Sequence, residues 1–175
     1  MEEMFDVYNE NGEYLGVKSK SFCHREDAGV WHKPVWIWIV DKLGGGILVQ
    51  KHDAGKKHFP NKYDIPSAGH VHAGEKPIEA CVRETKEELG IDTKEDDFVF
   101  LTEWKFDIGW EFAQVYLLDI DASKAKFVLE EGKVGKVKWL SYKEFEKLIY
   151  SDEFCPHQKE FKDWSCKMLK KELAK

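Results

Sequence analysis

Residues 69–91 hold glycines and charged residues at fixed spacing, and this segment constrains the fold more than any other part of the sequence. The pattern reads Gly-x5-Glu-x7-Arg-Glu-Thr-x-Glu-Glu-x-Gly-Ile, and its specified residues are Gly69, Glu75, Arg83, Glu84, Glu87, Glu88 and Gly90. Pro77 suits the first turn of a helix, where its missing N–H would have no partner anyway. Gly90 suits the position just past a helix end, so the segment predicts a helix over residues 78–89.

The predicted helix has an acidic face and an apolar face. At roughly 100° per residue, Glu84, Glu87 and Glu88 fall on one side. The opposite side carries Ile78, Cys81, Val82, Thr85 and Leu89. Each like-charge pair three or four residues apart destabilises a helix by roughly 0.2–0.5 kcal/mol. The acidic face is either an ordinary solvated surface or the binding site of a divalent cation such as Mg²⁺ or Mn²⁺, which prefers oxygen ligands and also binds phosphates.

This segment resembles the Nudix box, the signature of enzymes that cut a diphosphate linked to another moiety. Every charged and glycine position of the box is filled, and the one departure is Thr85, where the family usually has an aliphatic residue. The methyl group of Thr85 can pack in the apolar arc while its hydroxyl bonds the preceding turn. The resemblance implies a single domain over residues 1–175 with the Nudix α/β/α sandwich, in which a mixed sheet lies between helices.

The resemblance also implies the metal ligands. Glu84, Glu87 and Glu88 match family residues that bind the metal, and the carbonyl group of Gly69 matches a further ligand. Glu75 would either bind metal or brace the loop before the helix. The bound Mg²⁺ or Mn²⁺ would neutralise phosphate charge and polarise an attacking water.

For the catalytic roles, the sequence leaves more than one candidate. Arg83 is expected to pair with Glu84 and fix its rotamer. Glu84 and Glu88 are the first candidates for the general base. Three residues outside the box are further candidates by position, each with a plain surface role as the alternative: Glu111, Glu130 and Glu131.

The rest of the sequence predicts strands and helices around the box. An Asn-Gly turn predicts an N-terminal hairpin over about residues 5–17. The continuous apolar run 35–40 predicts a strand buried on both faces. Further strands are expected over 47–50, 98–106, 110–120 and 134–140, and helices over 142–150 and 158–173. The glycines at 44–46 read as a turn, because neither Gly-Lys-Ser/Thr nor a helix follows them.

Outside the box, residues 5–120 resemble isopentenyl-diphosphate isomerases and their Nudix relatives. The matching motifs are Phe22-Cys23-His24-Arg25, Trp31-His32, Gln50-Lys51 and the run 59–64 leading into Gly69-His70. In the isomerases, histidines that match His24, His32 and His70 help to hold a metal. Together with Glu111, these residues are candidates for a second metal site or for phosphate contacts.

Two positions count against isomerase chemistry. The isomerase has a catalytic cysteine immediately before the box glycine, where this chain has Ala68, and a second glutamate where it has Ala113. Because both acid–base groups are missing, we favour hydrolysis of a nucleoside diphosphate derivative or related pyrophosphate. The alternatives are the isomerase and a non-catalytic Nudix-like binding module, although such sensors commonly lose box carboxylates that this chain keeps.

The charge balance limits the partners. There are 27 Lys and Arg against 33 Asp and Glu, a net charge of −6, which does not favour nucleic-acid binding. The sequence also has no lysine-rich block for a membrane surface. A small diphosphate substrate remains compatible, because a bound metal supplies local positive charge. Candidate substrate contacts are Lys51, Lys57, Phe59, Trp31 and Trp110.

The four cysteines are scattered, without a close pair or a zinc-binding spacing. We expect free thiols in a reducing cytoplasm, since no apolar leader is visible at the N-terminus. Whether the protein is a monomer or a homodimer stays open.

Overall fold

The apolar run of residues 35–40 forms the centre of a mixed β-sheet in the computed structural model, which describes residues 1–175. This strand, β3 (Pro34–Asp41), is buried along its whole length, as its pattern predicts. On one side it pairs in parallel with β8 (Glu111–Asp119). Beyond β8, the antiparallel strand β7 (Phe98–Phe106) forms the edge of the sheet.

On its other side β3 has two partners, because β3 and β4 (Gly46–His52) diverge after their connecting turn. The segment that fills the gap pairs first with β4, as β5 (Tyr63–Asp64), and then with the start of β3, as β6 (Ser67–His70). The far edge of β4 pairs with β9 (Val134–Ser141). This crossing brings Gly69, where the box begins, to the middle of the sheet.

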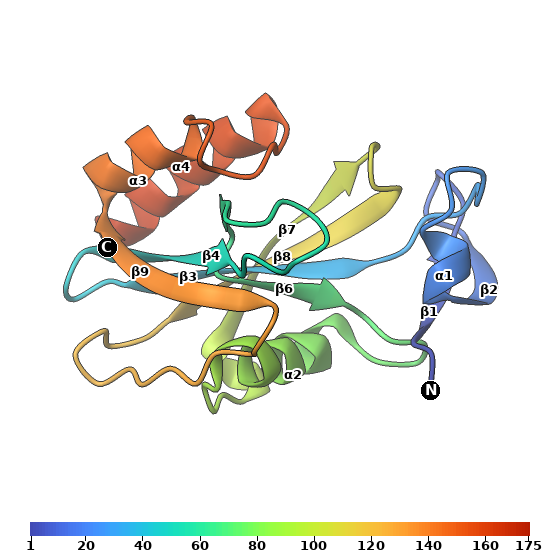
Figure 1. Cartoon of the computed structure of the whole chain (residues 1–175), viewed down its shortest axis with the longest axis horizontal. Coiled ribbons are helices and arrows are strands. Elements are labelled where there is room, and N and C mark those ends of the chain that lie inside the picture. The colour runs from blue at the N-terminus through green and yellow to red at the C-terminus, as the bar shows by residue number, and fades with distance from the viewer.

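Helices cover both faces of the sheet (Figure 1). One face packs against α2 (Pro77–Leu89), and the other against α3 (Tyr142–Ile149) and α4 (Lys159–Leu173). Separate hydrophobic clusters fill the two layers, one under α3 and α4 and one under α2. The predicted α/β/α sandwich is confirmed. None of the helices combines the length and the apolar composition that crossing a membrane requires.

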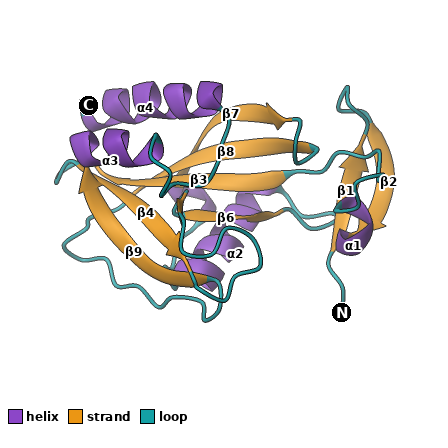
Figure 2. Ribbon diagram, turned by 45° about the horizontal axis from the view of Figure 1, so that its top comes forward, coloured by secondary structure: helices purple, strands orange, loops and turns teal.

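The predicted N-terminal hairpin is also confirmed. It consists of β1 (Met4–Tyr8) and β2 (Tyr14–Ser19), and the short helix α1 (Lys20–Cys23) follows it. Figure 2 shows this unit at the end of the sheet opposite the chain's C-terminus. The fully buried ring of Phe5 attaches it to the domain by stacking on His70, with 4.7 Å between ring centroids.

The predicted element boundaries differ from the observed ones by one or two residues. The strand expected over 110–120 starts at Glu111, because Trp110 has a φ of 54°, which no β-strand residue adopts. Short strands β5 and β6 were not predicted as strands, and a connecting 3₁₀ turn, η1 (Glu95–Asp97), precedes β7.

Candidate active site

The acidic face of α2 packs against β6 instead of facing solvent. Glu84 and Glu88 are buried, whereas Glu87 at the rim keeps 48% of its side chain exposed. Gly69 makes this packing possible, because a Cβ atom at residue 69 would lie only 1.9 Å from Cδ of Glu84. The ordinary solvated helix face is therefore not what the structure shows for Glu84 and Glu88.

Burial changes the protonation of both carboxyl groups. Glu88 is 4% exposed, and burial raises its pKa to about 7, although its Oε2 accepts a hydrogen bond from the N–H of Ala68 at 3.0 Å. Burial also raises the pKa of Glu84, and the guanidinium of Arg83 only partly offsets this. Two buried carboxylates with too little neighbouring positive charge are a suitable environment for a cation.

Arg83 organises the start of the helix. Its Nε and Nη2 donate to the two oxygens of Glu75, both at 2.9 Å, and its Nη1 donates to Oε1 of Glu84 at 2.5 Å. Its Nη2 also donates to the carbonyl oxygen of His70 at 2.8 Å. The expected pairing with Glu84 is present. Both oxygens of Glu75 are engaged, since Oε2 also accepts the N–H of His72, and this favours the bracing role over the metal-binding one.

The box therefore presents only oxygen donors to a cation: the carboxylates of Glu84, Glu87 and Glu88 and the carbonyl of Gly69. This donor set fits Mg²⁺ or Mn²⁺, which prefer carboxylate and carbonyl oxygens. The raised pKa values of Glu84 and Glu88 support the fit, because a cation between them would offset their burial.

Two lysines whose charges act on the carboxylates, Lys56 and Lys133, were not predicted from the sequence. Lys56 lowers the pKa of Glu88, while Glu84 and Glu88 raise the pKa of Lys133 against the effect of its burial. Lys133 also pairs with Glu130 at 3.1 Å. Neither lysine belongs to a motif, and only the folding of two distant loops brings them to the helix.

Among the outside candidates for a base, Glu130 is joined to the box helix through its backbone. Its backbone N–H donates to the carbonyl oxygen of Glu88 at 3.0 Å, while Glu131 is exposed.

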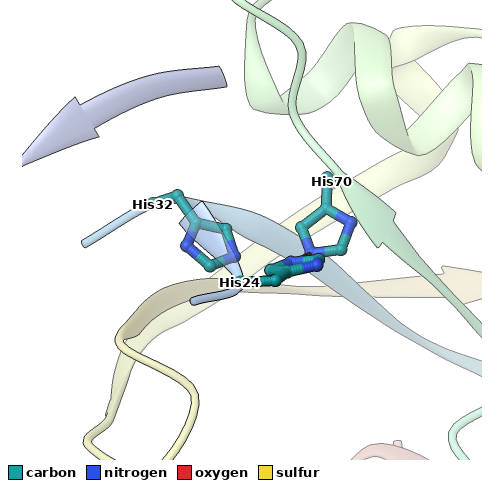
Figure 3. Close-up of side chains that lie close together, drawn as sticks. All are labelled: His24, His32 and His70. Carbon is teal, nitrogen blue, oxygen red and sulfur yellow. Dashed lines mark hydrogen bonds between the residues drawn. The ribbon is translucent and has the colours of Figure 1, made fainter. Parts of the chain in front are cut away.

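The three histidines expected to gather do so (Figure 3). The Nε2 atoms of His24 and His70 lie 3.3 Å apart, and Oε1 of Glu111 lies 3.5 Å from Nε2 of His32. Both ring nitrogens of His32 are buried without a hydrogen bond. Burial and the neighbouring imidazoles lower the pKa of His24 to about 4. The cluster thus offers imidazole nitrogens and one carboxylate, a set that could hold a metal.

The histidine cluster and the box carboxylates occupy opposite sides of β6. Gly69 faces Glu84 on α2, and adjacent residues of a strand point to opposite faces, so His70 points away from α2. A cavity of about 580 Å³ borders the cluster and is lined in part by His24, Phe59, Trp110 and Glu111.

Three of the five expected substrate contacts are not among the residues that line this cavity, and their role in substrate binding stays a prediction: Trp31, Lys51 and Lys57. Trp31 is buried, with its ring centroid 4.9 Å from that of Phe112. The Nζ of Lys51 lies 5.3 Å from the ring centroid of Tyr63. Lys57 is exposed, next to the better placed Lys56.

The two positions that count against an isomerase are part of the hydrophobic layer under α3 and α4. Ala113 is fully buried there, and Ala68 packs against the same cluster. The ring of Phe161 fills the space nearby, 5.0 Å from the ring of Trp36. No group at Ala68 or Ala113 can exchange a proton.

Sequence comparisons agree with these features. The model of the NUDIX domain matches residues 30–164. The chain is 35% identical over 164 residues to Nudix hydrolase 3 of Arabidopsis thaliana, which is 87% of this chain but 21% of that protein. The chain thus spans about a fifth of the length of that relative. An uncharacterized Nudix hydrolase of Clostridium acetobutylicum is 35% identical over 146 residues, 78% of this chain and 69% of that one.

Isomerases match over a shorter range. The isopentenyl-diphosphate Delta-isomerase of Streptomyces griseus is 33% identical over 88 residues, which is 50% of this chain and 44% of that protein.

Solved structures show the same fold. The DR0079 protein of Deinococcus radiodurans has a TM-score of 0.70 at 22% identity, covering 97% of this chain and 98% of that one. A MutT structure from a study of Aliivibrio salmonicida and Vibrio cholerae has a TM-score of 0.57 at 20% identity, covering 78% and 94%. From the box geometry, the domain match and these relatives, the chain belongs to the Nudix family.

Proposed function

We propose that this protein is a metal-dependent hydrolase that cleaves a phosphoanhydride bond in a nucleoside diphosphate derivative or a related pyrophosphate. The observation that carries the proposal is the pair of buried carboxylates, Glu84 and Glu88, packed against Gly69 with raised pKa values. A purely structural helix gains nothing from burying two carboxylates together. A divalent cation would offset the burial of the two carboxylates and would bind the phosphate groups of the substrate.

Each residue of the site has a defined task in this reaction. Mg²⁺ or Mn²⁺ held by the box carboxylates would supply charge neutralisation and a polarised water. Arg83, braced by Glu75, fixes the carboxylate of Glu84. Lys56 and Lys133, whose charges act on the same carboxylates, would bind phosphate oxygens.

Glu88 is the favoured proton acceptor for the attacking water. In the metal-free protein burial raises its pKa to about 7, so this carboxylate takes up a proton more readily than an ordinary glutamate does. Its Oε2 accepts the Ala68 N–H, so Oε1 is the oxygen that would face the metal and the attacking water.

The test is a substrate screen followed by two variants. Nucleotides, sugar nucleotides and isoprenyl diphosphates should be assayed with Mg²⁺ and with Mn²⁺. On the best substrate, Glu87→Gln should lower kcat by roughly 10²-fold or more, because one charged ligand is lost from a half-exposed position whose other contact is an ion pair with Arg83 at 3.4 Å. The matched control is Glu160→Gln, an exposed glutamate on α4 at the opposite face of the sheet.

The bond that breaks can be identified with isotopes. Hydrolysis in ¹⁸O-water should place the label in a phosphate product, since the carboxylate site stabilises charge on phosphoryl oxygens. Label found only in a non-phosphorylated alcohol, or full turnover in excess EDTA, would refute the proposal. Tight metal-dependent binding without any turnover would identify a binding module instead.

A further inference from the structure

A second cluster of metal-binding side chains lies apart from the box and from the histidines of Figure 3. It joins His52 at the end of β4, Asp64 in β5, and Cys155 and His157 in the connection between α3 and α4. The donor atoms of His52, Asp64 and Cys155 all lie within 4.8 Å of one another. His52 and Cys155 are buried, 5% and 3% exposed, so the cluster is built into the interior.

The donor atoms of this cluster lie close enough together to share one ion. Nε2 of His52 lies 3.3 Å from Oδ2 of Asp64, and Sγ of Cys155 lies 3.9 Å from the ring of His52 at Nδ1. Bonds of about 2.0–2.3 Å to Zn²⁺ put tetrahedral ligands roughly 3.3–3.6 Å apart. Because the three donor atoms lie within 4.8 Å of one another, side-chain adjustments of roughly 1 Å or less would bring them to these separations around an ion.

The surroundings hold the donors in orientations suited to a metal. Nδ1 of His52 is 2.9 Å from the carbonyl oxygen of Phe59 and must donate to it, which leaves Nε2 as the ligand atom. Metal-binding histidines commonly donate their other N–H to a carbonyl group in this way. Nε2 of His157 lies 2.6 Å from Oδ1 of Asp64 and so positions the carboxylate from its far side.

The mixed donors distinguish this cluster from the box. One thiol, one imidazole and one carboxylate suit Zn²⁺, whereas Mg²⁺ prefers oxygen ligands alone. Cys155 is also no candidate for a nucleophile, because its buried sulfur has no path to a substrate.

We propose that His52, Asp64 and Cys155 bind a Zn²⁺ ion, with His157 positioning Asp64. The ion would join β4 and β5 to the α3–α4 connection, where Cys155 N–H already donates to the carbonyl of Tyr63 at 2.8 Å. It would also anchor the loop that contains Phe59 and Asn61, whose φ angles of 51° and 61° are unfavourable for residues other than glycine. Through Phe59 this loop lines the 580 Å³ cavity.

The experiment uses Co²⁺ as a spectroscopic substitute for Zn²⁺ in the full-length metal-free protein. A Co²⁺–thiolate bond gives a near-ultraviolet charge-transfer band, and neither the box carboxylates nor the three histidines of Figure 3 include a sulfur ligand. We expect one equivalent of Co²⁺ to produce the band and Zn²⁺ to abolish it by displacement. Cys155→Ser should lose the band, and the matched control Cys23→Ser, a buried cysteine beside His24, should keep it.

Two further measurements complete the test. His157→Gln should bind Zn²⁺ roughly 10- to 100-fold more weakly, as expected for the loss of a group that orients a ligand. X-ray absorption of the zinc-loaded wild type should show one sulfur neighbour at about 2.3 Å, which does not depend on any variant folding. A zinc spectrum with only nitrogen and oxygen neighbours, or a band that persists in Cys155→Ser, would overturn the proposal.

Discussion

The position of the Glu84 carboxylate depends on two residues, Gly69 and Arg83. Gly69 contributes by having no Cβ atom. Gly69 leaves the space that the carboxylate occupies, and Arg83 binds the carboxylate from the other side. Glu88 has a backbone N–H but no arginine, which is why burial dominates its pKa. The site is thus organised for Glu84 and electrostatically incomplete at Glu88, and a cation would complete it.

Gly69→Ala tests the close approach. The new Cβ would overlap the Glu84 carboxylate and push it from β6, and a displacement of about 1 Å in a catalytic group can cost roughly 10²-fold in rate. We expect kcat to fall by about that factor and KM to change little, with the far-ultraviolet circular dichroism unchanged. Wild-type kcat in a folded Gly69→Ala protein would show that Glu84 does not need its observed position.

The raised pKa of Glu88 predicts that the free energy of unfolding of the metal-free protein falls as the pH rises. Its pKa is about 7 in the folded state against 4.5 for the ordinary group, so folding favours the protonated form. This contribution is complete below pH about 4.5 and is lost as the pH rises through 7, a change of on the order of 3 kcal/mol. Urea unfolding in EDTA should therefore show stability falling over this window.

Two comparisons isolate the cause of that pH dependence. Glu88→Gln should flatten it, because the amide does not titrate. Saturating Mg²⁺ should also flatten it, because the cation replaces the proton. If Glu88→Gln keeps the same slope as wild type, another group is responsible.

Among the elements, α2 was the most predictable from sequence. Pro77, Gly90 and the apolar spacing fixed its ends to within one residue, and Gly90 has the left-handed φ of 71° typical of a helix C-cap. The burial of its acidic face was not predictable, since helical spacing defines the faces but not which strand covers them. The gap that β5 and β6 fill arises only when β3 and β4 diverge, and strands of two and four residues leave little periodicity to detect.

Thr85 allows a test of the box's one departure. Its side chain is fully buried, and its hydroxyl donates to the carbonyl of Cys81 at 2.5 Å, as the sequence suggested. Thr85→Val keeps the shape and removes a bond to a carbonyl that the helix already uses. We expect the free energy of unfolding to change by less than about 1 kcal/mol and kcat to stay at the wild-type value. A loss above about 2 kcal/mol would mean that the hydroxyl is required for the fold.

At the scale of the whole molecule, one strand serves both faces of the sheet. Gly69 on β6 faces the box carboxylates, while Ala68 and His70 face the other side, where Ala68 packs against the hydrophobic cluster under α3 and α4 and His70 meets His24. The sequence thus carries, at consecutive positions, one residue for each side of the strand: Gly69 for the box and His70 for the histidine cluster. Its motif positions predicted that His24, His32 and His70 lie together. The positions of Lys56, Lys133 and the Cys155 cluster depend on how distant loops pack, and no local sequence pattern predicts that packing.

The last prediction concerns isomerase activity. The protein should not interconvert isopentenyl and dimethylallyl diphosphate, because Ala68 and Ala113 present only methyl groups in a packed apolar layer. Ala68→Cys should not create the activity either: it restores a thiol, but Ala113 still lacks the carboxylate needed to exchange the second proton. The measurement is product formation from isotopically labelled isopentenyl diphosphate with Mg²⁺ and Mn²⁺. Isomerisation by the wild type above the rate in buffer would mean that the acid–base groups come from elsewhere, with Glu111 beside the histidine cluster the first residue to substitute.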